Sequence, residues 1–481
     1  MILNHIDSYN DELKTLEIYR IQQRFINQNI YQSAGMEDLN EINVVDEFPL
    51  KNISEGDYFT FSNSVAFKVT NLTHGIHTYP AKFIPHIPRW AFKYSNLKEG
   101  SVVFDPFVGC GTTLVEARLH KLNSLGTEIN PLGRSLSEVK SNPIFEESPK
   151  AIFAYTNQLL DKIKNDKKEI LINDINNLPK NWHFWFPEKL LKDIIRIKKN
   201  ILIFRPSTLK PIKEPDLEKL RKLYLVTLSS IIKKASYLDE SQIKVFKKKE
   251  KFKQGYPNVI NLFKQAIEKN QKGVYEFTKY IRYDKKYAKI IGNDARNVDL
   301  EDSSVDLIVT SPPYINAIDY PMAHKYSLFL LNLVDVEDYK KHCRDYIGMT
   351  ERAVKSSDYS ELKLTGFEEI DNKIRKIFKN GSSTDKNRAF ILHQYFSGMK
   401  TAFKEFHRIL KNNSNFIIVV GDNQIRGEHI PTAVFLEKVA TSEGFKKVVS
   451  FRHYYKNVRL KINRNKTGGK INYETLLVLK K

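Results

Sequence analysis

The feature that most constrains the fold is a short apolar run that leads into a glycine-containing turn and then into a helical pattern. Residues 101–105 (Ser-Val-Val-Phe-Asp) have the character of a buried parallel strand. The segments predicted to follow are a turn holding Gly109 and Gly111, a helix over 112–121, a strand over 123–128 and a helix over 132–140. This order predicts the opening of a doubly wound sheet.

The alternation of strands and helices stops after this opening and resumes much later in the chain. Further strands are predicted over 289–294, 305–310, 416–420, 447–451 and 475–479. The intervening block has helical spacing of apolar residues, for example Leu190, Leu191, Ile194, Ile197 and Ile201. We therefore expect an α/β fold, a Rossmann-like seven-stranded sheet interrupted by a mainly helical insertion. The expected divisions are an N-terminal extension (1–70), the first part of the sheet domain (71–144), the insertion (145–285) and the second part of the sheet domain (286–481). A polar insertion is expected near 355–387, with a loop over 381–385.

The charge of the chain favours a polyanionic partner. Lys and Arg number 77 against 56 Asp and Glu, which gives a net charge of +21. A Lys-rich proteome would give the same composition. The sequence has no apolar run of membrane-spanning length and no signal-peptide pattern, and its two cysteines make neither a disulfide scaffold nor a zinc cage. We expect a cytoplasmic protein with no membrane partner and no metal.

The glycine turn and two acidic residues suggest a cofactor site at the carboxyl ends of the strands. Gly109 and Gly111 allow the backbone to approach a ligand closely, and the helix that follows points unpaired N–H groups toward it. Glu128 ends the second strand, where it can accept hydrogen bonds from ribose hydroxyls; alternatively it is a solvated charge. Asp294 ends the third strand and can accept a bond from an adenine amine; alternatively it is a turn or helix-capping aspartate.

The segment Thr310-Ser-Pro-Pro-Tyr314 follows a predicted strand and forces the chain out of the sheet. Ser311 offers a hydroxyl and Pro312 a backbone carbonyl, which together form an acceptor pair suited to a planar amine. Such a pair returns electron density to an exocyclic base amine, which is otherwise a poor nucleophile. Tyr314 offers a ring face for a base that has flipped out of a duplex. The alternative is a rigid strand exit with a packed tyrosine.

These motifs resemble those of the DNA amino-methyltransferase family, which makes N4-methylcytosine or N6-methyladenine. Residues 105–113 (Asp-Pro-Phe-Val-Gly-Cys-Gly-Thr-Thr) resemble its motif I, residues 310–314 its motif IV and residues 77–85 its motif X. The resemblance covers about 71–142 and 286–481. It implies a methyltransferase fold, S-adenosylmethionine as the cofactor and double-stranded DNA as the substrate. It also implies a catalytic set of Ser311, Pro312, Pro313 and Tyr314, and a cofactor set of Tyr79, Lys82, Phe83, Asp105, Phe107, Gly109, Gly111, Thr112, Thr113, Glu128, Asn130, Asp294 and Ala295.

The target base follows less directly from the resemblance. Methylation at carbon 5 is disfavoured because it needs a Pro-Cys nucleophile, whereas Cys110 lies in the cofactor loop and Cys343 follows a histidine. The serine of the catalytic motif favours cytosine N4, and the order of the motifs favours adenine N6; we favour cytosine. A role in restriction-modification or phage defence is expected, with a cognate endonuclease or defence subunits as partners. The alternatives are an RNA base-amine methyltransferase and a non-catalytic DNA-binding subunit of a defence complex.

Two parts of the sequence are candidates for DNA contact. The insertion over 145–285 holds an aromatic run at 182–186, which is either domain core or a stacking element, and a lysine run that either contacts phosphates or is a solvated loop. A second basic stretch lies in a predicted C-terminal hairpin. The predicted DNA-contacting residues are Lys247, Lys248, Lys249 and Lys251 in the insertion, and Arg452, Lys456 and Arg459 in the hairpin.

Overall fold

The structure is a computed structural model. It describes residues 42–62, 70–80, 82–143, 150–171, 177–207, 212–248, 250–281, 284–315, 318–349, 351–454 and 473–481. Three of the residues predicted to contact DNA, Lys249, Lys456 and Arg459, lie outside the described residues.

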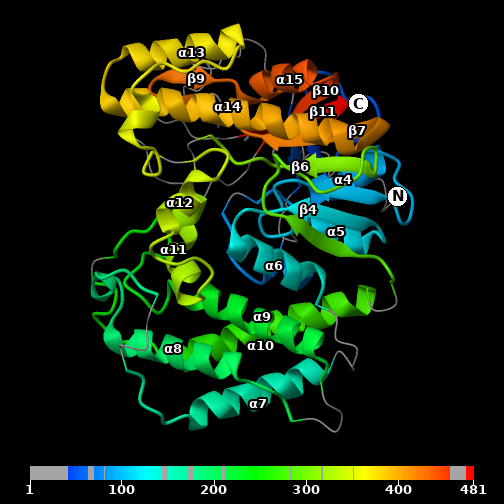
Figure 1. The fold of residues 1–481 in the computed structure, drawn as a ribbon. Coiled ribbons are helices and arrows are strands. Elements are labelled where there is room, and N and C mark those ends of the chain that lie inside the picture. Colours follow the sequence, from blue (N-terminus) through cyan, green and yellow to red (C-terminus); the bar gives the residue numbers. More distant parts are fainter. Residues whose placement is uncertain are drawn as a thin grey trace, which may run out of the picture.

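The described residues form one large sheet of nine strands (Figure 1). The strands are β1 (Ile42–Val45), β2 (Tyr58–Phe61), β3 (Val102–Asp105), β4 (Asn123–Thr127), β5 (Ala288–Gly292), β6 (Val305–Thr310), β7 (Leu410–Val420), β10 (Lys446–Tyr454) and β11 (Tyr473–Lys480). Their order is β1-β2-β10-β11-β7-β6-β3-β4-β5. The last seven in this order are the predicted strands, so the expected fold class is confirmed. The N-terminal extension adds β1 and β2 at the β10 edge, which the sequence analysis did not anticipate.

The pairing of β3 with β6 positions the two motifs. The two strands run parallel, with Val103 opposite Leu307 and Phe104 opposite Ile308. Parallel neighbours end at the same edge of a sheet, so the segments that follow β3 and β6 leave it side by side. The one strand of the seven that runs against its neighbours is β11, which pairs antiparallel with both β10 and β7.

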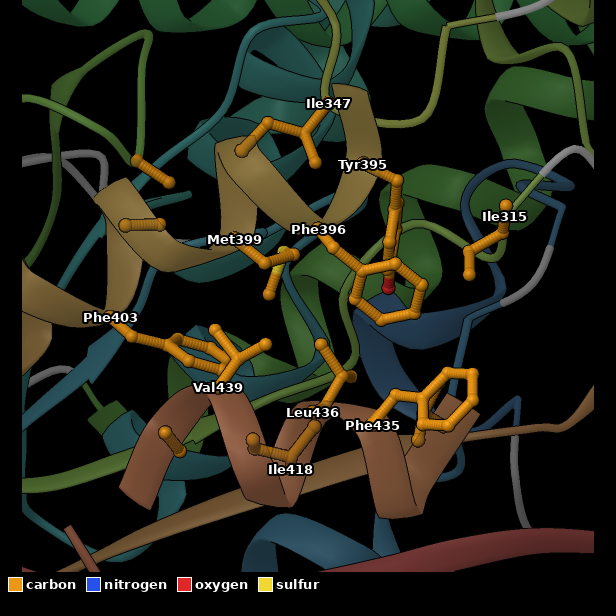
Figure 2. Packing of buried hydrophobic residues seen from close by; sticks show 14 of the residues in the cluster. Ile315, Ile347, Tyr395, Phe396, Met399, Phe403, Ile418, Phe435, Leu436 and Val439 are labelled. Carbon is orange, nitrogen blue, oxygen red and sulfur yellow. The ribbon is translucent and has the colours of Figure 1, made fainter. Parts of the chain in front are cut away.

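Alternate residues of β7 face two separate apolar cores. Phe416 and Ile418 pack on one face against α14 (Ser383–Ile409) and α15 (Thr432–Ser442), whereas Ile417 packs on the other face with α4 (His86–Tyr94). Figure 2 shows Ile418 of β7 gathered with side chains of α14 and α15. Both faces are thus covered, as the continuous apolar strands require. Near β3, β4 and β5 lie α5 (Thr112–Leu119) and α6 (Pro131–Ser141), and η1 (Leu72–Gly75) contacts both helices.

The helices between α6 and β5 form a bundle with its own apolar core, which lies at one end of the molecule in Figure 1. They are α7 (Ala151–Asn165), η3 (Trp182–Phe184), α8 (Glu188–Leu202), α9 (Glu214–Ile231) and α10 (Val259–Ile281). The five apolar residues that predicted helical spacing in α8 are all buried. The bundle core also takes in Tyr326 and Phe329 of α11 (Tyr320–Leu330), so the helix after the catalytic motif joins the insertion to the sheet domain.

The predicted loop over 381–385 is wrong, because α14 already begins at Ser383. The Ser382 side chain accepts a hydrogen bond from the backbone N–H of Asp385 and caps the helix. The polar segment before it contains η4 (Ser356–Tyr359) and α13 (Glu368–Lys379). The remaining described elements are α12 (Tyr339–Arg344) and the hairpin of β8 (Asn423–Ile425) with β9 (Glu428–Ile430). Among the helices that the structure describes, we find none with both the length and the apolar character of a membrane span.

Candidate active site

Asp105 ties the cofactor loop to the catalytic strand. Its carboxylate accepts hydrogen bonds from the Phe107 backbone N–H (3.1 Å) and from the hydroxyls of Thr113 and Thr310 (both 2.6 Å). Thr310 ends β6, immediately before the catalytic motif. Burial raises the pKa of Asp105 to about 6, although these hydrogen bonds oppose the shift. Asp105 thus lies behind the pocket and holds the two motifs together.

Gly109 and Gly111 both adopt left-handed backbone conformations, with φ of 55° and 88°. A Cβ at Gly111 would lie 2.8 Å from the Cα of Ser137 in α6, so a side chain there would push the two helices apart. A Cβ at Gly109 would lie 3.3 Å from the ring of Tyr79, so a side chain at Gly109 would narrow the pocket that both residues line. The glycines therefore serve the predicted tight turn and the close packing of the loop against α6 and Tyr79, and their approach to a ligand stays a prediction.

Glu128 follows β4 and faces the cofactor loop. Its carboxylate accepts hydrogen bonds from the backbone N–H groups of Gly109 (2.6 Å) and Asn130 (2.8 Å). Burial raises the pKa of Glu128 to about 7, although the two backbone bonds oppose the shift. Its side chain is therefore held at the pocket wall and is not a solvated strand-end charge. Asn130 caps α6 and contacts His324 of α11 at 3.0 Å, which places it behind the wall.

A pocket opens where the loops after β3, β4, β5 and β6 meet. Of the predicted site residues, those that line it are Tyr79, Lys82, Phe83, Phe107, Gly109, Thr112, Glu128, Asp294, Ala295, Ser311 and Pro313. Those outside the lining are Asp105, Gly111, Thr113, Asn130, Pro312 and Tyr314. The pocket is also lined by Tyr320, Asp345, Tyr346 and Ile347, which were not predicted from the sequence.

Asp294 lines the pocket and is also paired with a cation. Its two carboxylate oxygens accept hydrogen bonds from the Arg296 guanidinium at 2.8–3.1 Å. Burial raises the pKa of Asp294, but the bonds from Arg296 outweigh it, and the net pKa lies below its ordinary value. Asp294 is therefore an ionised acceptor at the wall, and its turn-forming role is also realised through the Arg296 backbone N–H.

The catalytic motif is held rigidly on both sides. Before it, Thr310 is bonded to Asp105; after it, Ile315 is 1% exposed and packs in the core of α14 and α15 (Figure 2). Ser311 is half-buried at the pocket, and the Tyr314 side chain is buried with its hydroxyl 3.3 Å from Glu474 of β11. A rigid loop of this kind holds the Ser311 hydroxyl in a fixed place at the pocket.

The structure brings the aromatic run and the lysine run of the insertion together. Phe184 is 47% exposed, and the Lys247 ammonium lies 4.1 Å from the centre of its ring. Phe186 of the same run is core, which confirms the core alternative for this residue, and stacking of the exposed Phe184 on DNA stays a prediction. Lys248 is also exposed, whereas the Lys251 ammonium donates to the carbonyls of residues 233 and 238, which makes it an internal structural group.

Arg452 lies among aromatic rings at the sheet edge. Its guanidinium lies 5.0 Å from the ring centre of Tyr58 and 5.5 Å from that of Tyr473, and it donates to the Tyr58 hydroxyl at 2.7 Å. It is half-buried at the end of β10 that precedes the hairpin connection. Arg452 thus lies on the sheet, whereas Lys247 belongs to the helical insertion.

Comparisons with known proteins identify the family. A family model of DNA methylases matches residues 62–134 and 305–481, slightly more than half of the chain. The type II methyltransferase M.MvaI of Kocuria varians is 26% identical over 447 residues, covering 88% of this chain and 93% of that protein. The type II methyltransferase M.BsoBI of Geobacillus stearothermophilus is 24% identical over 437 residues, covering 81% and 82%. The chain therefore belongs to the DNA methylase family: it is a DNA methyltransferase with S-adenosylmethionine as its cofactor.

Proposed function

We propose that this enzyme methylates the N4 amine of cytosine at specific sites in duplex DNA, as the modification enzyme of a restriction-modification system. The observation that carries the proposal is the Asp105 carboxylate, which joins the cofactor loop to Thr310 at the start of the catalytic motif. This bond fixes the distance between the cofactor pocket and Ser311. Two reactants held at a fixed separation gain a large part of the rate enhancement from positioning alone.

The lining residues fit S-adenosylmethionine. Glu128 presents a buried carboxylate suited to ribose hydroxyls, and Asp294 presents an ionised acceptor suited to the adenine amine. The amino end of α5, with its partial positive charge, would attract the methionine carboxylate. A side chain at Gly109 would crowd the pocket, since its Cβ would come within 3.3 Å of the Tyr79 ring. When bound, the cofactor supplies a methyl group activated by a sulfonium.

The catalytic motif would hold and activate the target amine. The Ser311 hydroxyl and the Pro312 carbonyl would accept the two amine hydrogens, which returns the nitrogen lone pair toward the methyl group. The Tyr314 ring would stack on the flipped base. These roles rest on the resemblance of the motif and on its rigid support by Thr310 and Ile315.

A methylation assay tests the proposal. Purified protein with labelled S-adenosylmethionine should transfer methyl groups to PCR-amplified bacterial DNA, which carries none beforehand, and transfer to tRNA should be negligible. The Ser311→Ala variant should lose activity by about 100-fold or more, because one preorganised acceptor is removed. Ser304→Ala is a matched control, since among the described residues the Ser304 hydroxyl bonds only to the loop carbonyl of Glu301 before β6. Full activity of Ser311→Ala would refute its assigned role.

Mass spectrometry of the methylated nucleosides decides the base. The proposal requires N4-methylcytosine, because the motif begins with serine. N6-methyladenine as the product would overturn the choice of base and would favour the interpretation drawn from the motif order. A methylated RNA with unmodified DNA would overturn the substrate. Restoration of growth in cells that express a cognate endonuclease would support the restriction-modification role.

We further propose that the helical insertion recognises the DNA. Its exposed Lys247 and Lys248 would contact phosphates, and Phe184 would contact bases or sugars beside them. The cation–π pair of Lys247 and Phe184 supports a joint role, because it holds a charge and an apolar ring at one point of the surface. Arg452 would contact the DNA near the target base. A cognate endonuclease is the proposed partner in the system.

A further inference from the structure

The hydroxyl of the catalytic-motif tyrosine has a specific buried partner. Tyr314 donates a hydrogen bond to Oε2 of Glu474 at 3.3 Å, and the other carboxylate oxygen of Glu474, Oε1, lies 3.0 Å from Nδ1 of His453. Glu474 is 1% exposed and His453 is 4% exposed. Neither residue lines the pocket, and neither was predicted from the sequence.

The sheet topology brings this pair to the catalytic motif. Glu474 and His453 lie directly opposite each other on the antiparallel strands β11 and β10. β11 is inserted between β10 and β7, and β7 neighbours β6, so a single strand, β7, separates Glu474 from the strand that leads into the motif. The hydrogen bond from Tyr314 therefore joins the catalytic motif to the C-terminal hairpin.

Apolar aromatic rings pack against the His453 end of the pair. The His453 ring packs 5.7 Å from the ring of Phe48 and 5.0 Å from that of Phe61, both from the N-terminal segment. A carboxylate in such a place is unfavourable unless its oxygens are hydrogen-bonded, and here each oxygen has a partner. An apolar residue would pack a strand interior equally well. The carboxylate therefore has a use beyond packing, and the Tyr314 hydroxyl identifies it.

We propose that Glu474 is a positioning residue that fixes the plane of the Tyr314 ring, and that His453 in turn fixes Glu474. The inference rests on the proposed function, in which the Tyr314 ring stacks on the flipped base. A ring free to rotate would meet the base in many orientations, whereas a ring anchored through its hydroxyl presents one face. The amine is then aligned with the acceptors of Ser311 and Pro312.

A double-mutant cycle on Tyr314 and Glu474 tests this inference. Tyr314→Phe keeps the ring but removes its anchor, so kcat on PCR-amplified bacterial DNA should fall by about 10- to 100-fold. Glu474→Leu should give a fall of similar size. The double variant should be no slower than Glu474→Leu alone, because both changes remove the bond between Tyr314 and Glu474. Binding of S-adenosylmethionine, measured by calorimetry, should stay within about twofold of the wild type in all three, since neither residue lines the pocket.

A conservative variant and a matched control separate positioning from stability. Glu474→Gln keeps an oxygen acceptor for the Tyr314 hydroxyl and should restore most of kcat. Asp371→Asn alters another buried carboxylate, which is bonded to Thr365 beside α13, and its effects should multiply with those of Tyr314→Phe.

The outcomes are distinguishable. Wild-type protein without methylation of DNA would refute the proposed function itself. Active wild type with additive losses in the cycle would overturn the inference about Glu474 and leave the function intact. If Glu474→Leu does not fold, Tyr314→Phe and Glu474→Gln still decide the question. Full kcat in Tyr314→Phe, or a Glu474→Gln variant as slow as Tyr314→Phe, overturns the inference.

Discussion

At the scale of single residues, two carboxyl groups dominate the cofactor side of the site. Asp105 and Glu128 end or follow neighbouring strands, and burial raises the pKa of the first to about 6 and of the second to about 7. Their roles differ because their partners differ. Asp105 accepts three hydrogen bonds from protein donors of both motifs and holds the motifs together, whereas Glu128 faces the pocket and keeps capacity to accept from a ligand.

The raised pKa of Glu128 predicts a pH dependence of stability. Between about pH 4.5 and 7 the folded state binds more protons at this site than the unfolded state, so stability should fall as pH rises through this window. The glutamine of the Glu128→Gln variant does not titrate in this window, so the variant serves as the reference. The free energy of unfolding of the cofactor-free wild type should therefore fall relative to that of Glu128→Gln by about 1 to 3 kcal/mol across the window, as measured by urea denaturation. Parallel pH profiles would contradict the prediction.

A buried hydroxyl gives a second prediction at this scale. Tyr395 of α14 is 0% exposed, and its hydroxyl has no hydrogen-bond partner among the residues that the structure describes. Tyr395→Phe should leave the free energy of unfolding unchanged or raise it by about 1 kcal/mol, because an unsatisfied polar group is removed. Tyr224 is also 0% exposed, but its hydroxyl lies 3.2 Å from that of Thr156, so Tyr224→Phe should cost about 1 kcal/mol. Equal losses in both variants would refute this distinction.

At the scale of elements, α6 supports the cofactor loop through a close contact at Gly133. A Cβ there would lie 2.9 Å from both Cγ of Glu128 and the backbone oxygen of Gly109. Alanine stabilises a helix by about 1 kcal/mol relative to glycine. Any loss of cofactor affinity in Gly133→Ala must therefore come from its contacts with Glu128 and the cofactor loop. We expect an intact fold with affinity for S-adenosylmethionine reduced by about 10-fold or more, measured by calorimetry. Ser135→Ala on the same helix is the control. Unchanged affinity in Gly133→Ala would show that Glu128 is not confined by α6.

The elements differ in how far the sequence reveals them. Strands such as β6, β7 and β11 were predictable because buried strands contain runs of apolar residues. The strand Tyr58–Phe61 is equally buried, but its pairing with Arg452 and His453 spans most of the chain, and no local pattern reports such a contact. The polar cluster at 381–385 has the composition of a loop although a helix begins within it, because helix caps use the same residue types as turns.

The site residues that belong to sequence motifs were predictable, whereas those that the fold brings in from distant segments were not. The glycine turn, Glu128 and Ser311 lie at strand ends, whose positions follow from the strands themselves. Tyr346 and Ile347 reach the pocket from a segment after α12 that has no pattern of its own. Glu474 was missed for another reason: a charged residue in a strand is expected to face solvent, and only the packing around His453 buries it.

At the scale of the whole molecule, the sheet domain has α13 and α14 at one end and the bundle of α7 to α10 at the other, with α11 and α12 between them (Figure 1). The turn that carries Lys247 and Lys248 belongs to the bundle and is held by backbone bonds between residues 239 and 246 and between 237 and 248, both 2.8 Å. A charge on a fixed turn can set the register of DNA, which a solvated lysine loop cannot.

The last prediction concerns this turn and the DNA that it would contact. Lys247→Ala and Lys248→Ala should each weaken binding to all DNA sequences and lower the slope of log affinity against log salt by about 1, because each phosphate contact releases about one counterion. Phe184→Ala should leave that slope unchanged and instead alter which sites are methylated, as mapped by sequencing modified bases.

Lys279→Ala is the matched control. Its ammonium also lies over an aromatic ring, 4.3 Å from the centre of Tyr275, but it is near the far end of α10. A helix of 23 residues is about 34 Å long. If Lys279→Ala changed the slope of log affinity against log salt as much as Lys247→Ala does, the net charge of +21 would attract DNA without a defined binding surface on the protein. A slope change confined to Lys247 and Lys248 would assign the contact to this turn. All three lysines contribute equally to the net charge, so a difference between them can arise only from counterions released where a lysine contacts a phosphate.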